Sequence, residues 1–183
     1  MAKKKDTTMV CEYFKTSDIH ICGRFKHYAD AMWTQNAIQK SHIRRLVDLY
    51  AIAAVVGLRK GLRLEEDSSD DKRTIQMQQL NESYQTLSSI MKLVLMVDES
   101  RGLDEEERIR SAFKVPENRE EHDAGMELFN SYARGGIEYM YEQLVTRVNT
   151  DTSEEDFGDV RINNIVAFLK DMTGNQLVDF EEE

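Results

Sequence analysis

Residues 46–63 read LVDLYAIAAVVGLRKGLR, and this stretch decides the fold. Its apolar and small residues recur at steps of three and four, which predicts a helix: Ile43, Leu46, Val47, Tyr50, Ala54, Gly57, Leu58 and Gly61. Ser41 is expected to cap its start and Gly61 to end it. Because apolar residues also fill the other faces, we expect its middle to be covered nearly all round, as the central helix of the fold. Ala53, Ala54 and Gly57 would let a partner helix approach closely.

Further helices are predicted on both sides of this stretch. Apolar spacing favours helices over 25–39, 77–95, 104–113, 117–148 and 160–172, whereas 64–73 is acidic and reads as a loop. Residues 10–23 alternate weakly and predict a short strand or extended segment. Gly135 and Gly136, inside the long helix, permit either close packing or a kink.

These elements predict an all-α fold with a single helical domain. We expect an N-terminal extension at 1–23, the helical domain at 24–174 and an acidic tail at 175–183. One proline and nine glycines leave little material for a turn-rich β architecture, and 40% hydrophobic with 32% charged residues suits a helical protein.

Charge is divided between the two ends of the chain. Residues 1–63 contain 12 Lys or Arg against 5 Asp or Glu, and residues 64–183 contain 12 against 29, within a net charge of −10. Such a division lets one surface attract a polyanion or an acidic partner while the other repels it. The pattern favours a binding protein over an enzyme.

Five basic residues are the candidate partner-binding site: Arg44, Arg45, Arg59, Lys60 and Arg63. They sit at the two ends of the central helix. The last three coincide with its C-terminus, where cations also stabilise the helix dipole, so a purely structural role is the alternative. Otherwise they form a patch that contacts phosphates or carboxylates. Aromatic residues are not interleaved with them, so base stacking is not indicated.

No motif predicts catalysis, a cofactor or a metal. Phosphate-binding loops of the G-x-x-x-x-G-K-[ST] and G-x-G-x-x-G kinds are missing from the sequence, as is the G-x-S-x-G nucleophile turn. Cys11, His20, Cys22 and His27 lack the paired spacing of zinc ligands. The acidic runs at 105–107 and 151–156 are expected to be solvated surface. We therefore expect a protein that is not an enzyme.

The sequence gives no sign of a membrane segment. Its longest apolar stretch, 49–58, is far shorter than the roughly 20 residues that a spanning helix needs. The first ten residues lack the apolar core of a signal peptide. A cytoplasmic location, with no membrane partner, is the expectation.

Two blocks carry a family resemblance. Residues 46–63, already quoted, and residues 128–144, LFNSYARGGIEYMYEQL, resemble a family of small proteins encoded beside the DNA phosphorothioation (Dnd) genes of bacterial defence islands. The first block is similar to the family's Ala-rich helix with a basic, Gly-containing end, and the second to its Tyr-Ala-x-Gly-Gly-hydrophobic signature. The resemblance runs from 43 to 144; residues 1–40 and those after 150 have no counterpart. It implies a helical fold, association with anti-phage or DNA-modification systems, and no assigned catalytic residues.

Together these observations give one leading hypothesis and two alternatives. The leading one is a non-enzymatic accessory subunit of a prokaryotic defence complex. It would dock a larger nuclease, ATPase or modification enzyme through its basic N-terminal surface or its Gly/Ala-rich helix face, and nucleic acid would be reached through that complex. The alternatives are a small DNA-binding protein or regulator, and a phage-encoded inhibitor whose acidic C-terminal surface mimics DNA.

Overall fold

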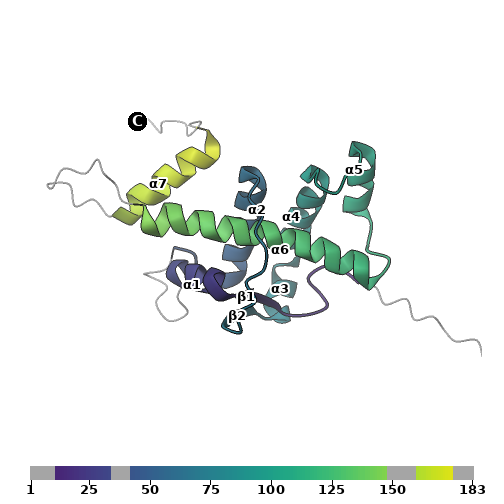
Figure 1. The fold of residues 1–183 in the computed structure, drawn as a ribbon, viewed down its shortest axis with the longest axis horizontal. Helices are drawn as coiled ribbons and strands as arrows, with labels where there is room; N and C mark the ends of the chain where they lie inside the picture. The colour runs from purple at the N-terminus through teal and green to yellow at the C-terminus, as the bar shows by residue number, and fades with distance from the viewer. Residues whose placement is uncertain (1–10, 34–41, 148–159, 175–183) are drawn as a thin grey trace, which may run out of the picture.

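The computed structural model describes residues 11–33, 42–147 and 160–174. In chain order, the elements are β1 (Ile19–Cys22), α1 (Gly23–Met32), α2 (Leu46–Lys60), β2 (Lys72–Ile75), α3 (Met77–Glu82), α4 (Tyr84–Val97), α5 (Glu105–Phe113), α6 (Arg119–Tyr141), the π-helical turn η2 (Glu142–Thr146) and α7 (Val160–Thr173). Figure 1 shows α6 running the length of the molecule, with α7 at one end and α5 at the other.

The main packing contact joins α2 to α6. At the crossing, a Cβ on Gly136 would lie 1.8 Å from the carbonyl oxygen of Ala53, and a Cβ on Gly57 would lie 2.0 Å from that of Tyr132. Each glycine therefore lets the other helix's backbone come within contact distance. The predicted close approach of a partner helix to α2 is confirmed, and α6 runs through Gly135 and Gly136 without interruption.

The segment that follows α2 crosses α6 a second time. Gly61 ends α2 in the left-handed conformation (φ 67°), as predicted, and turns the chain back. Leu64 then donates its N–H to the carbonyl of Ser131 (3.1 Å), while Arg134 Nε donates to the carbonyl of Leu64 (2.8 Å). Figure 1 shows α2 crossing one side of α6 and this segment crossing the other on its way to β2. The central part of α6 is thus held from two sides.

A two-stranded antiparallel sheet corrects the prediction of an all-α fold, although the described chain is mostly helical. β1 pairs with β2 in the register Ile19 with Ile75 and Cys22 with Lys72. β1 lies in the segment expected to be extended, whereas β2 begins inside the stretch 64–73 predicted as a loop. Ile19, Ile21 and Ile75 are buried on one side of this sheet, so strand pairing is stabilised by the core beneath it.

Residues 11–22, expected to be an extension, contribute to the core. Phe14 is buried and its ring meets that of Phe129 edge-on, with ring centroids 5.1 Å apart. The apolar residues of β1 belong to the same buried cluster. This N-terminal segment is therefore integral to the packing of α6.

α2 is central and its middle is covered nearly all round, as predicted, except along one strip. Ala53 and Ala54 are completely buried, yet the side chain of Ile52 is 43% exposed and Arg59, on the same face, is exposed. The helix begins at Leu46 after Arg45; the predicted cap, Ser41, lies outside the described residues. α2 therefore keeps one solvent-facing strip.

The other helices lie where they were predicted along the chain, but several of them begin or end at different residues. α5 and α7 each agree within a residue of their predicted bounds, and Asp104 caps the start of α5. The stripe at 77–95 is divided at Ser83 into α3 and α4, and the long helix becomes a π-helical turn after Tyr141. α1 ends at Met32; residues 34–41, the loop at 149–156 and the acidic tail lie outside the described residues. Within the described ranges, no helix combines the length and the apolar character needed to cross a membrane.

Candidate functional site

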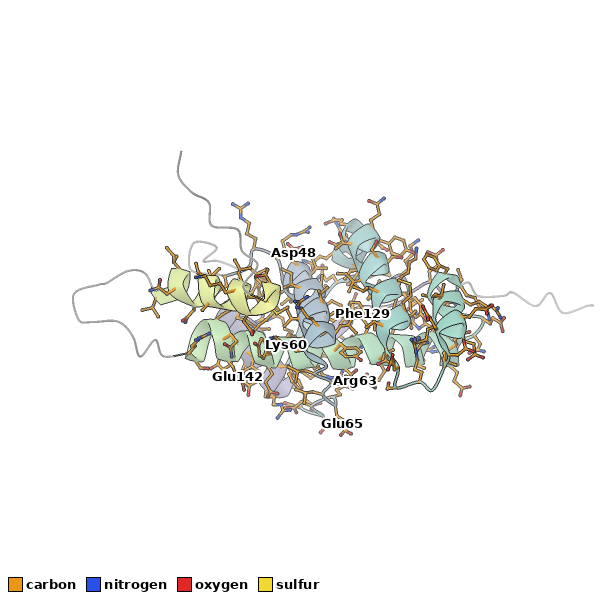
Figure 2. The ribbon with its side chains drawn as sticks, turned by 90° about the horizontal axis from the view of Figure 1, so that it is seen from above. Asp48, Lys60, Arg63, Glu65, Phe129 and Glu142 are labelled. Carbon is orange, nitrogen blue, oxygen red and sulfur yellow. The ribbon has the colours of Figure 1, made fainter. Side chains whose placement is uncertain are left out.

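The five candidate basic residues do not form one patch. Arg44 and Arg45 precede α2, whereas Arg59, Lys60 and Arg63 lie at its C-terminal end. A helix rises about 1.5 Å per residue, so the 15-residue α2 separates the two groups by roughly 22 Å. Figure 2 shows Lys60 and Arg63 near one end of α2 and Asp48 at the other.

Three of the five, Arg45, Lys60 and Arg63, form ion pairs with acidic residues. Arg45 Nε donates to Asp48 at 2.8 Å, one turn into α2. Lys60 Nζ lies 2.8 Å from a carboxylate oxygen of Asp171 on α7, and this hydrogen bond holds the pKa of Asp171 below its usual range. By contrast, Arg44 and Arg59 are exposed and have no carboxylate partner in the described part of the chain.

Arg63 helps to neutralise a buried carboxylate. Asp98, at the end of α4, has a side chain only 1% exposed and accepts hydrogen bonds from Tyr132 (2.6 Å) and Ser100 (2.8 Å). Arg63 and Arg101 approach the same carboxylate at 3.6 and 3.9 Å. Burial alone would raise the pKa of Asp98, but these hydrogen bonds and guanidinium charges outweigh it and lower the pKa. This geometry gives Arg63 a structural role.

Asp98 and the four side chains around it, Arg63, Ser100, Arg101 and Tyr132, form what we call the Asp98 cluster. From this cluster we expect a loss of stability in alkaline solution. Burial, followed by the hydrogen bond to Asp98, raises the pKa of Tyr132 to about 12, against about 10 for an unfolded tyrosine. As pH rises above 10, Tyr132 loses its proton in the unfolded chain before it does so in the folded protein. The free energy of unfolding therefore falls between pH 10 and pH 12. We expect wild type to lose about 2–3 kcal/mol more than Tyr132→Phe over that interval, measured by urea unfolding at each pH. Equal losses in the two proteins would contradict the assignment.

An exposed apolar surface, not predicted from the sequence, lies at the opposite end of the molecule from α7. Ile109 and Phe113 stand one turn apart on α5, and Val115 follows the helix; we call these three residues the α5 surface. All three are exposed. Phe113, at 65%, has the largest exposed fraction of any large apolar side chain in residues 11–33, 42–147 and 160–174. Such exposure is typical of interaction sites.

The α5 surface borders a pocket of about 180 Å³. Phe113 and Val115 form one edge, between α5 and the N-terminal segment. Met91 on α4 and Ala112 on α5, both buried, lie beneath it. We call this space the Phe113 pocket.

Two tyrosines that line the Phe113 pocket are held in place by neighbouring side chains. The ring of Tyr13 stacks on His122 of α6, with centroids 5.5 Å apart and planes 19° from parallel. The hydroxyl of Tyr84 donates to Glu12 at 3.2 Å, and Lys15 Nζ lies 4.0 Å from the centre of the same ring. The pocket is thus bounded by aromatic rings whose positions are fixed before any ligand arrives.

The cysteines and histidines considered as zinc ligands have other neighbours in the structure. Cys11 is buried, His20 hydrogen-bonds Thr74 at 3.0 Å, and Cys22 contacts Glu66. Across the described residues, no cluster of three or more His, Cys, Asp and Glu side chains is arranged to hold a metal ion.

Comparisons of the chain with models of protein families, with curated proteins and with solved structures gave no match. The Dnd-associated resemblance therefore remains an expectation from the two quoted blocks of sequence.

Proposed function

We propose that the protein is a non-enzymatic interaction subunit that docks a larger protein through the α5 surface. The observation that carries this proposal is Phe113, which is 65% exposed beside a pocket with fixed aromatic walls. Large aromatic side chains next to preformed pockets dominate the binding energy of protein interfaces. Burying Phe113, Ile109 and Val115 against a partner would remove apolar surface that water now contacts.

The structure changes which surface is available for docking. The Gly/Ala-rich face of α2, one of the two surfaces expected from the sequence, is covered by α6 at Gly57 and Ala53. In the basic group, Lys60 is paired with Asp171 and Arg63 lies at Asp98. These contacts favour the α5 surface over both earlier candidates.

Direct DNA binding is the weaker proposal. Of the five basic residues, only Arg44 and Arg59 are both exposed and without a described carboxylate partner, and they lie at opposite ends of α2. Several neighbouring phosphate contacts are needed for substantial affinity, and a net charge of −10 opposes a polyanion at long range. Within our proposal, the partner is a larger nuclease, ATPase or modification enzyme of a cytoplasmic defence complex, as the resemblance implies.

Partner capture with a Phe113→Ser variant tests the proposal. Truncation of an aromatic residue at the centre of an interface typically costs at least about 2 kcal/mol, so we expect the captured partner to fall roughly 30-fold. The measurement is quantitative mass spectrometry of proteins retained by the tagged chain in its native cells. Phe113→Ser itself should keep its thermal unfolding temperature, because the side chain is mainly solvated.

Ile162→Ser on α7 is the matched control. Ile162 is 58% exposed, and α7 lies at the other end of α6 (Figure 1). We expect this variant to retain the partner in full. Equal retention by both variants, or loss with Ile162→Ser alone, would reject the α5 surface as the docking site.

A further inference from the structure

The Phe113 pocket has the size of one large side chain. Sites for drug-sized ligands occupy roughly 300–1,000 Å³, well above the 180 Å³ found here. An apolar cavity of about 150 Å³ accommodates a benzene molecule. A single aromatic or long aliphatic side chain therefore fits this space, whereas a nucleotide does not.

One part of the pocket suits an apolar group, and the rest of its lining is polar, from Glu12, Ser88, Lys92 and Lys114. Its lining includes the buried side chains of Met91 and Ala112, the ring of buried Pro116, and the rings of Tyr13 and Tyr84. Aromatic rings provide large contact areas for another ring or for an aliphatic chain. Methionine, with its flexible and polarisable side chain, adapts to different shapes.

A lysine at the mouth adds positive charge. Lys92 Nζ lies 5.3 Å from the centre of the Phe113 ring and has no carboxylate partner among the residues that the structure describes. The other charges at the mouth are paired: Lys114 with Glu117 at 2.7 Å, and Glu12 with Lys15. Lys92 is thus the unbalanced charge at the pocket, on a chain whose net charge is negative. A carboxylate on an incoming segment would complement it.

From this geometry we infer that the Phe113 pocket receives one large apolar side chain of a partner protein, with an acidic residue beside it that pairs with Lys92. The inference rests on the proposed docking function and specifies the chemistry of the partner segment. The apolar side chain supplies most of the binding energy, because its pocket is preformed. The acidic neighbour determines which segments are accepted.

Selection from a phage-displayed library of random dodecapeptides on the immobilised full-length chain tests the inference. Wild type should enrich peptides with an aromatic or large aliphatic residue next to Asp or Glu. Lys92→Glu should instead enrich the same apolar residues next to Lys or Arg, because the charge at the mouth is reversed. No enrichment, or the same acidic preference with both proteins, would overturn the inference.

A pair of neighbouring serines on α4 locates the bound peptide. Ser88 lines the pocket, and Ser89 is exposed and does not. Ser88→Trp should place a bulky ring at the pocket and weaken a selected peptide at least tenfold, whereas Ser89→Trp should leave its affinity unchanged. A peptide that binds Ser88→Trp as tightly as wild type would show that the pocket is not its site. If partner capture depends on Phe113 while these peptide tests fail, the docking proposal stands and the pocket inference falls.

Discussion

Alanine at position 136 is expected to destabilise the protein by about 3 kcal/mol or more, the upper range for overpacking. The added methyl carbon would lie 1.8 Å from the carbonyl oxygen of Ala53, and a backbone atom of a buried helix cannot move aside alone. The two helices would have to separate along their whole contact. Thermal unfolding followed by circular dichroism should show a fall in Tm of roughly 6–12 °C, or no soluble folded protein.

Gly125→Ala in the same helix is the control for this result. There the added carbon would meet the end of a side chain, 2.5 Å from the hydroxyl oxygen of Tyr13, and no backbone atom of another helix. Its effect should be much smaller, since alanine also favours the helix over glycine by about 1 kcal/mol. A Gly136→Ala protein as stable as wild type, or more stable, would mean that α2 and α6 do not touch at these glycines.

Asp98→Ala should produce the second large effect, a loss of about 3 kcal/mol in the free energy of unfolding. Removing one partner from a buried charged cluster leaves the others without compensation, typically at 3–5 kcal/mol. We take the lower value because the side chain of Arg63 is 41% exposed, so water can solvate its charge once the carboxylate is gone. Glu99→Ala is the matched control: the neighbouring carboxylate is 81% exposed and, among the residues that the structure describes, pairs with Arg108 alone, at 3.6 Å. We expect less than about 0.5 kcal/mol there, by urea unfolding.

Acid pH provides a second readout of the same carboxylate. Because the pKa of Asp98 is lower in the folded protein than in the unfolded chain, its contribution is present above about pH 4 and is lost as pH falls through the folded pKa. The Asp98→Ala protein should therefore lose less stability than wild type in this acid range. If the two unfolding curves fell in parallel below pH 4, or if Asp98→Ala cost no more than Glu99→Ala, the cluster would not stabilise the fold as described.

The periodic parts of the fold could be predicted from sequence because their signals are local. Spacing at three and four residues located the central helix, Gly61 located its end, and the residues before Pro116 located the short acidic helix α5. Small residues in α2 indicated that another helix comes close to it. Each of these features depends on residues within a few turns of one another.

The remaining features depend on contacts between distant segments, which a single sequence does not display. β2 lies in a largely acidic stretch and is a strand because β1 is available to pair with it. From the sequence, Lys60 has no evident acidic partner; in the structure, α7 places Asp171 beside it. Ile52 is as apolar as its buried neighbours but lies off the stripe of residues spaced at three and four, and the arrangement of the other helices leaves it exposed.

The α5 surface was missed for a related reason. Phe113 and Val115 stand at the end of a short acidic helix, just before Pro116, and the local sequence does not tell whether such apolar residues are buried or exposed. Their exposure follows from how α5 packs on α4, with Ala112 facing inward and Phe113 facing out. The pocket beside them also needs Tyr13, from a segment that the sequence assigned to an extension.

The crossing of α2 and α6 also constrains the order in which the chain can fold. Nearly half of the sequence separates Gly57 from Gly136, so this contact closes a long loop and cannot form early in synthesis. Until α6 has emerged from the ribosome, the small-residue face of α2 has nothing to pack against. The native contact between these two helices can therefore form only after residue 136 has been synthesised.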